Sequence, residues 1–210
     1  MTACNIIRYL TLSDLPQVTA VHRAAFPESL FTALGPEATR RYYEWQLLGP
    51  HEVTALGAFK NKELKGFLFG GVFRGAMGGF LRKNWGYLGW CVMTHPRVWL
   101  HHTFRARLRE GGGILRKQIG TNPSQRQNHR GKPFGILSIA VDPYLQRSGV
   151  GKMLMQVAET IARGHAFQDM HLTVHPGNLQ AVRFYQRLGW EKICEENSSF
   201  NGYMKKLLRP

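Results

Sequence analysis

The sequence predicts an α/β fold, and two stretches in its C-terminal half carry that prediction. Residues 136–141 form an apolar run rich in β-branched side chains, which is typical of a buried strand. After a short loop, residues 150–161 place apolar side chains at helical spacing, with polar side chains on the opposite face. A second strand over residues 172–174 is followed by a helix whose apolar face carries Ala181, Phe184, Tyr185 and Leu188. Strands that alternate with helices in this way indicate an α/β domain.

The first 73 residues predict further strands and helices. Ser13-Asp14 followed by Pro16 is a signal for the start of a helix, and Asn61-Lys62-Glu63 is a suitable turn for a hairpin. The expected elements are a strand over residues 6–10, helices over 15–26, 28–34 and 36–48, and hairpin strands over 53–59 and 64–73. Periodicity alone thus predicts strands and helices but not how they are connected in space.

A glycine loop joins the strand that ends at Val141 to the helix behind it. Its sequence is Gln146-Arg147-Ser148-Gly149-Val150-Gly151-Lys152. Such a loop directs several backbone N–H groups and the positive end of a helix dipole toward one place, which makes it suited to an anion. A Walker loop is excluded because Met153 stands where Ser or Thr is required, and a Rossmann loop is excluded because residue 154 is Leu. A helix N-terminus without a ligand is the structural alternative.

Two linked motifs carry a resemblance to a known family. The spacing Gln/Arg-x-x-Gly-x-Gly after a strand that ends Val-Asp-Pro resembles the acetyl-coenzyme A loop of the GNAT N-acyltransferase superfamily. The pattern Asn-x-x-Ala-x-x-Phe-Tyr-x-x-Leu-Gly-Trp, from Asn178 to Trp190, is similar to the second half of the same cofactor site. The resemblance is close over about residues 134–206. It implies one acyltransferase domain over residues 1–210, with a mixed, mostly antiparallel central sheet flanked by helices.

The resemblance also implies an activity, namely transfer of an acetyl group from acetyl-CoA to a primary amine by direct attack in a ternary complex. The backbones of Ile139, Ala140 and Val141 would pair with the pantetheine arm of this co-substrate. The N–H groups of residues 146–152 would hold its pyrophosphate, with charge added by the basic side chains. Asn178 would cap a helix and could also donate a hydrogen bond to the cofactor.

Tyr185 is the residue that this resemblance places at the leaving thiolate. Its ordinary pKa of about 10 keeps it protonated at neutral pH, although packing in the core would explain a tyrosine here equally well. The base is not identified. The related N-terminal acetyltransferases carry a glutamate where this chain has Thr173, and His175, Glu28, Glu44 or a water chain remain alternatives.

Residues 74–132 exceed the short turn of a minimal GNAT domain and predict an insertion before the cofactor-binding strand. Twelve Lys/Arg side chains and one acid give this segment +11, which leaves +4 of the net +15 for the other 151 residues. We expect helices near the acceptor side followed by a mobile basic loop, with a purely structural insert as the alternative. The positive charge favours an anionic acceptor, such as an amino sugar, a nucleotide-linked amine or a peptide amine.

Two other functions remain open. The chain could be a non-catalytic, CoA-binding module that recognises a partner or nucleic acid through its basic insertion. It could also be a nucleic-acid-associated protein, although it shows no recognised nucleic-acid motif. Tyr185 together with an intact glycine loop favours catalysis.

The remaining composition bounds the setting. Three widely spaced cysteines and the absence of a basic-then-apolar start favour a cytoplasmic protein, and no apolar stretch is long enough to span a membrane. No metal is expected, because His95, His101 and His102 lack accompanying carboxylates or cysteines at ligand spacing. A monomer or homodimer is expected.

Overall fold

The computed structural model describes residues 6–73, 76–94, 133–194 and 199–208. Most of the predicted insertion, residues 95–132, lies outside these ranges, as do the three histidines considered for a metal and most of the basic side chains considered for an anionic acceptor. Within the described part of the chain, no helix is long and apolar enough to cross a membrane.

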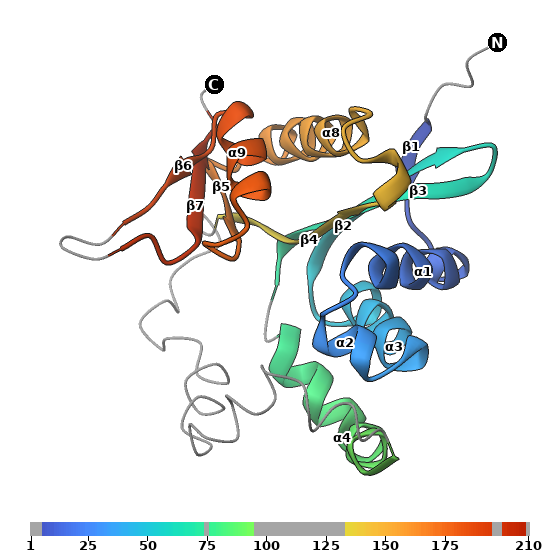
Figure 1. Ribbon diagram of the computed structural model, residues 1–210. Coiled ribbons are helices and arrows are strands. Elements are labelled where there is room, and N and C mark those ends of the chain that lie inside the picture. The colour runs from blue at the N-terminus through green and yellow to red at the C-terminus, as the bar shows by residue number, and fades with distance from the viewer. Residues whose placement is uncertain (1–5, 74–75, 95–132, 195–198, 209–210) are drawn as a thin grey trace.

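The molecule contains a seven-stranded sheet in the order β1-β2-β3-β4-β5-β7-β6, with helices on both faces (Figure 1). Neighbouring strands run antiparallel except β4 and β5, which are parallel. The elements are β1 (Ile6–Tyr9), η1 (Leu12–Asp14), α1 (Leu15–Ala25), α2 (Leu30–Ala33), α3 (Pro36–Leu48), β2 (Glu52–Lys60), β3 (Glu63–Val72), α4 (Ala76–Thr94), β4 (Phe134–Val141), η3 (Pro143–Leu145), α8 (Val150–Gly164), β5 (Asp169–Thr173), α9 (Leu179–Arg187), β6 (Glu191–Lys192) and β7 (Tyr203–Leu207). The predicted mixed, mostly antiparallel sheet flanked by helices is confirmed.

Two apolar layers hold the helices on the sheet. On one face, α8 and α9 pack on the central strands through a cluster that includes Leu154, Ala158 and Met170, each fully buried. On the other face, α1 and α3 pack on the same strands through a cluster that includes Phe67 and Phe69. Burial of these aromatic and aliphatic side chains contributes most of the stability of such a domain.

The hairpin between β2 and β3 forms as the sequence predicts. Asn61 and Lys62 have positive φ angles of 52° and 67°, which are the values of a two-residue turn whose twist matches that of the flanking strands. The short helix α2 covers only part of the predicted segment 28–34, because Ser29 caps it and a left-handed Gly35 ends it. Helix α4 lies at the start of the predicted insertion and packs on α3, and its Ala76 carbonyl accepts a hydrogen bond of 2.9 Å from the Trp45 indole N–H.

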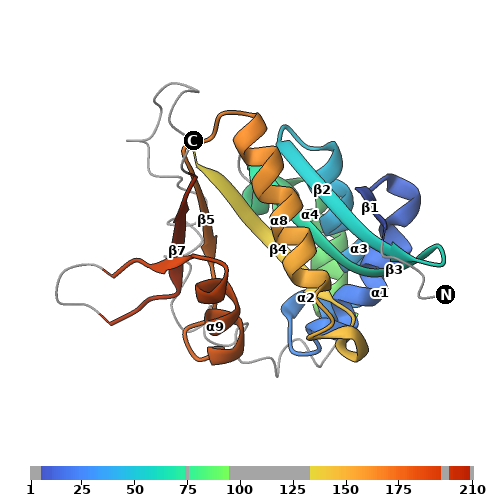
Figure 2. The same cartoon turned by 90° about the horizontal axis from the view of Figure 1, so that it is seen from above.

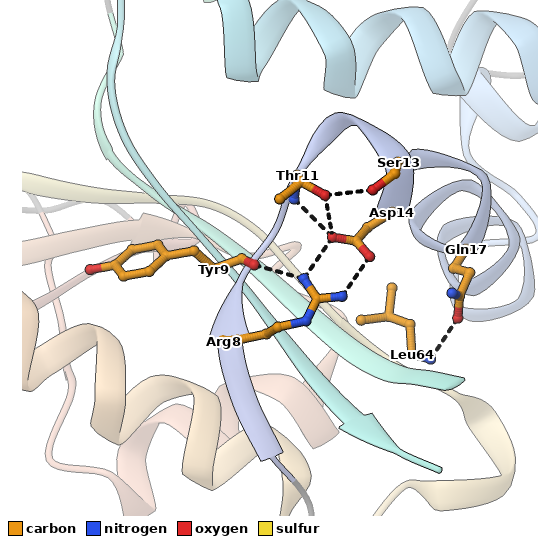
Figure 3. Close-up of polar contacts among 7 residues, drawn as sticks. All are labelled: Arg8, Tyr9, Thr11, Ser13, Asp14, Gln17 and Leu64. Carbon is orange, nitrogen blue, oxygen red and sulfur yellow. Dashed lines mark hydrogen bonds and ion pairs between the residues drawn. The ribbon is translucent and has the colours of Figure 1, made fainter. Parts of the chain in front are cut away.

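An ion pair joins β1 to the start of α1 (Figure 3). The Arg8 guanidinium donates to both carboxylate oxygens of Asp14, at 2.8 and 2.7 Å, and the backbone N–H of Thr11 donates to the same carboxylate at 2.8 Å. These donors lower the pKa of Asp14 to about 2, with Arg8 as the largest cause. Asp14 is itself the N-cap of α1, so the pair fixes the angle at which the chain leaves the sheet.

Candidate active site

The central feature of the site is the divergence of β4 and β5. These parallel strands pair only at Phe134 with Met170, Gly135 with His171 and Ile136 with Leu172. Beyond Ile136 the two strands separate, and among the residues that the structure describes the second half of β4 pairs with β3 alone (Figure 2). The backbone polar groups on the other side of this half-strand are therefore available to an extended ligand.

The register with β3 identifies which backbone groups face this opening. The N–H of Asp142 donates to the carbonyl of Lys65 at 2.9 Å, so these two residues form a hydrogen-bonded pair. Hydrogen-bonded and non-hydrogen-bonded pairs alternate along an antiparallel ladder. Ala140, opposite Phe67, therefore directs its N–H and C=O toward β3. Ile139 and Val141 direct theirs to the open side.

The glycine loop continues from this open edge in a left-handed backbone conformation. Arg147 has φ of 66° and Gly149 has φ of 89°, and residues 146–149 are all exposed. Gly149 is the N-cap of α8, and no side chain caps its N–H groups. The first N–H groups of a helix have no partner within the helix, so those of Val150, Gly151 and Lys152 remain available to an anion.

The two glycines of the loop have different structural roles. Gly149 is required by its backbone, because a left-handed conformation disfavours any residue with a Cβ atom. Gly151 lies at a close approach instead. A Cβ there would be 3.5 Å from the Phe184 ring and 3.6 Å from the Val141 side chain, so the start of α8 packs directly between β4 and α9.

A groove beside α8 begins at the same loop. It has a volume of about 490 Å³, and Lys152 lies at its glycine-loop end. The other lining residues come from α8, from the end of α9 and from β7. They include Gln156, Glu159, Arg163, Arg187, Trp190 and Lys206. Lys206 closes one side, with its ammonium 2.5 Å from Glu159 and 2.7 Å from the Leu188 carbonyl. Four basic side chains and one acidic side chain, Glu159, line the groove.

Helix α9 brings Asn178 and Tyr185 to the opposite side of the divergence. Asn178 caps the helix, since its side-chain oxygen accepts from the N–H of Ala181 at 3.0 Å, which leaves its amide nitrogen free to donate elsewhere. Tyr185 is buried beside Trp190, with a centroid separation of 6.0 Å between the rings. Burial raises the pKa of Tyr185 to about 12. Its phenol is therefore a proton donor at every physiological pH.

Comparison with known proteins agrees with this geometry. The model of the acetyltransferase (GNAT) family matches residues 111–190. The fold is similar to that of PaiA N-acetyltransferase from Thermoplasma acidophilum, solved with coenzyme A, at 15% identity and a TM-score of 0.57, covering 97% of this chain and 98% of that one. The chain has the GNAT fold. The resemblance predicted from the two motifs is confirmed.

Other solved structures show similar agreement. Ribosomal-protein-alanine N-acetyltransferase from Brucella melitensis matches at 16% identity and a TM-score of 0.55, covering 97% of this chain and 99% of that one. YncA from Salmonella typhimurium, solved with acetyl-CoA, matches at 15% identity and a TM-score of 0.55, covering 98% and 95% of the two chains. No curated protein matches the sequence.

The GNAT fold brings most of the predicted site residues to one place. Ile139 and Val141 lie on the side of β4 that faces the divergence, and Gly151 of the loop lies against Val141 and against Phe184 of α9, the helix that Asn178 caps. Ala140 stands apart in one respect, because its backbone is directed toward β3 and its side chain is buried on the α1 face. Of the three strand residues, Ala140 is thus the one whose backbone N–H and C=O face β3 and not the opening.

The structure does not identify any of the four candidate residues as the base. Thr173 is the last residue of β5, is exposed and pairs with Tyr203 of β7. His175 accepts a hydrogen bond of 3.1 Å from the N–H of Gly177 and so stabilises its own turn. Glu44 forms an ion pair of 3.4 Å with Arg40, and Glu28 is an exposed residue ahead of α2.

Proposed function

We propose that this protein is an acetyl-CoA-dependent N-acetyltransferase, which moves an acetyl group to a primary amine by direct attack in a ternary complex. One observation carries the proposal. The open side of β4 ends at Val141, and η3 and the glycine loop then return the chain so that the start of α8, with its free N–H groups, packs against Val141. A ligand that fits must have an extended arm with amide-like groups, followed by a phosphate, which is the chemistry of coenzyme A.

Each predicted residue has a defined task in this proposal. The N–H and C=O groups of Ile139 and Val141 bind the arm, and an N–H on this edge can stabilise the oxyanion that forms at the thioester carbon. The loop from Gln146 to Lys152 binds the pyrophosphate. Asn178 donates its side-chain N–H to the co-substrate.

Proton delivery to the departing sulfur falls to Tyr185 in the proposal. When the C–S bond breaks, the thiolate needs a proton, and the phenol of Tyr185 is held protonated by burial. The reaction adds the amine nitrogen to the thioester carbon, releases the thiol and leaves an amide. Net loss of one proton from the amine completes the balance, and that proton requires an acceptor other than Tyr185.

The acceptor class is proposed on charge. An amino sugar, a nucleotide-linked amine or a peptide amine would be drawn to a chain of net charge +15, the more strongly if the acceptor is anionic. Peptide amines have support from the solved structures, since one similar fold is that of a ribosomal-protein-alanine N-acetyltransferase.

Two measurements test the function. Calorimetric titration with coenzyme A should show a single site. Thiol release from acetyl-CoA should then rise in the presence of at least one amine, screened over an amino sugar, a nucleotide-linked amino sugar and peptides with free N-termini. Binding of coenzyme A without thiol release for any amine would favour the non-catalytic module. A protein with no measurable affinity for coenzyme A would refute the proposal as a whole.

A further inference from the structure

A row of hydrogen-bonded side chains crosses the α1/α3 face of the sheet and starts on β4. The hydroxyl oxygen of Ser138 lies 3.1 Å from that of Tyr43 on α3, and the Tyr43 oxygen lies 2.8 Å from Nδ1 of His22 on α1. On the far side of the ring, Nε2 of His22 lies 3.0 Å from the hydroxyl of Ser29, the cap of α2. Four side chains from four elements thus form one continuous chain of contacts.

The outer end of the chain determines the direction of its hydrogen bonds. The Thr32 hydroxyl donates to the backbone carbonyl of Phe26 at 2.8 Å, and a carbonyl can only accept. Thr32 has then used its single hydroxyl proton, so Ser29 must donate to Thr32, at 3.0 Å. Ser29 has in turn used its own proton. The contact between Ser29 and His22 therefore requires that Nε2 of the imidazole carries the proton.

The same count of donors and acceptors gives the direction of the hydrogen bonds at the inner end of the row. Burial lowers the pKa of His22 to about 4, so the imidazole is neutral at neutral pH and bears one proton. With that proton on Nε2, the lone pair of Nδ1 accepts from the hydroxyl of Tyr43. The Tyr43 oxygen must then accept from Ser138. Every hydroxyl proton in the row points from β4 toward α2, and the free lone pair of Ser138 is left to accept from another donor.

The middle of the row is buried, and its two ends are accessible to solvent. Tyr43 is fully buried and His22 is only 6% exposed, while Ser138 and Ser29 are both partly exposed. Burial raises the pKa of Tyr43 far above its ordinary value, so its hydroxyl passes a proton only by giving one and receiving another. Among the causes of the lowered pKa of His22 there is no charged side chain.

Ser138 lies where the reacting end of the co-substrate would stop. An arm that starts at the glycine loop and follows β4 from Val141 meets the point at Ile136 where β5 closes the opening. The open stretch from Val141 to Ser138 measures about 10 Å at the ordinary rise of a strand. A register shift in the pairing with β3 falls within this part of β4, and the neighbouring Leu137 packs in the cluster on the α1/α3 face.

We propose that Ser138, Tyr43 and His22 form a proton relay for the acetyl transfer, in which Ser138 accepts the proton of the attacking amine and His22 receives the relayed proton at Nδ1. This inference rests on the proposed function, for which it supplies the missing base. Ser138 is the member that touches the substrate, and Tyr43 and His22 act through it.

The step balances in protons and electrons. Attack by the neutral amine forms the N–C bond and places a positive charge on nitrogen, which makes its N–H far more acidic than that of the neutral amine. That proton moves to the Ser138 oxygen, the Ser138 proton moves to Tyr43, and the Tyr43 proton moves to Nδ1 of His22. The C–S bond then breaks with its electron pair on sulfur, which takes a proton from Tyr185. After the products leave, the proton returns from Nδ1 through Tyr43 and Ser138 to solvent, which restores the resting tautomer of His22 with its proton on Nε2. Tyr185 regains from solvent the proton that it gave to sulfur, so the net proton count is unchanged.

The weak basicity of His22 restricts when the relay can act. A group with a pKa of about 4 is a poor acceptor for the proton of a free alkylammonium ion, and the ammonium of the addition intermediate, which is more acidic, is the better donor. The amine must therefore arrive neutral. The relay assists the collapse of the intermediate and does not prepare the nucleophile.

Removal of a single hydroxyl tests the relay. Tyr43→Phe breaks the row at its centre, and Tyr42→Phe is the matched control, because Tyr42 is a buried tyrosine of the same helix outside the row. With acetyl-CoA and an amine that the wild type accepts, we expect Tyr43→Phe to lower kcat by about 10²-fold, at the low end for proton-transfer catalysis. The affinity for coenzyme A and the KM of the amine should stay near wild type. Tyr42→Phe should keep the wild-type kcat.

Two readouts separate a relay from a structural role. In mixtures of light and heavy water, the wild-type kcat should fall along a curve, which indicates several protons in motion, and the Tyr43→Phe curve should lose this curvature. Nitrogen NMR of the wild-type protein should show His22 neutral with its proton on Nε2. A proton on Nδ1 would reverse the row and overturn the proposal, as would equal kcat values for the two variants.

The outcomes also distinguish this inference from the proposed function. A wild-type protein that releases thiol, with Tyr43→Phe as active as Tyr42→Phe, would overturn the relay and leave the acetyltransferase intact. A wild-type protein that binds no coenzyme A would overturn the acetyltransferase, and the relay with it.

Discussion

Replacement of Gly149 by aspartate is the sharpest test of where the cofactor's phosphates bind. Gly149 caps α8 in a left-handed conformation, with no atom within 4 Å of the position that a Cβ would occupy. A side chain placed there meets no neighbouring atom, so its cost to the fold is that of the left-handed backbone alone. Gly149 directly precedes Val150, Gly151 and Lys152, whose free N–H groups are proposed to bind the pyrophosphate.

The expected loss of affinity follows from two contributions. A residue other than glycine in the left-handed region costs roughly 1–2 kcal/mol of stability, which affects folding more than binding. The aspartate also brings a negative charge close to the pyrophosphate. Two unit charges about 5 Å apart repel by roughly 1 kcal/mol in water and roughly 3 kcal/mol at an effective dielectric of 20. The affinity for coenzyme A should therefore fall by about 10- to 100-fold.

Gly149→Ala separates the two contributions, because alanine also places a Cβ atom in the left-handed region but carries no charge. Calorimetric titration with coenzyme A should show a nearly unchanged affinity for Gly149→Ala and the full loss for Gly149→Asp. Added salt should reduce the difference between the variants, since the repulsion is electrostatic. Equal affinities for the aspartate variant and the wild type would place the phosphates elsewhere and refute the assignment of the glycine loop.

Three further predictions use other contacts. Tyr185→Phe should lower kcat by about 10²–10⁴-fold and leave the calorimetric affinity for coenzyme A unchanged; a wild-type kcat, with chemistry rate-limiting, would return Tyr185 to a packing role. Asp14→Asn should lower the free energy of unfolding, measured in urea, by about 1–2 kcal/mol. This value is reduced for solvent screening, because the Arg8 side chain is nearly half exposed. An unchanged midpoint of the urea transition would contradict the prediction. The pKa of His22 is about 4 in the folded state, below its ordinary value of 6.5. Between pH 6.5 and pH 4, His22 is therefore protonated in the unfolded chain but neutral in the folded protein. The free energy of unfolding should fall by up to roughly 3 kcal/mol as the pH drops from 6.5 to 4, and His22→Asn should flatten that fall in urea titrations at several pH values.

The sequence predicted those parts of the fold that depend on neighbouring residues. The strand over residues 136–141, the glycine loop and the helix behind it form one contiguous segment, and each is specified by its own periodicity or turn residues. The same holds for the hairpin at Asn61-Lys62, whose left-handed turn needs only two residues of the right type. The residues of the glycine loop can therefore be identified from the amino-acid sequence alone, although their binding role stays a prediction.

The direction of backbone groups on β4 could not be predicted in the same way. Whether Ile139 or Ala140 faces the opening depends on the register with β3, which is fixed by the pair Lys65 and Asp142 across the sheet. A shift of one residue would exchange the two. The opening itself depends on where β5 leaves β4, after Leu172, and nothing in either strand's own sequence states that point.

The proposed base could not be predicted for a related reason, because the sequence motifs are local and the relay comes from four separate elements. A local signal nevertheless exists in the sequence. His22 falls on the buried face of α1 with Leu15 and Val18, and Ser138 interrupts the apolar run of β4. A polar group on an apolar face must find a hydrogen-bond partner, since leaving it unpaired costs about 1–3 kcal/mol. Two such residues, on opposite walls of one core, require a third polar group between them, and Tyr43 is the one that the fold supplies. A buried row of this kind costs stability unless every member has its hydrogen-bond partners. Here the row ends on β4, the strand that the co-substrate is proposed to follow, where the Ser138 oxygen keeps a lone pair that can accept a further proton.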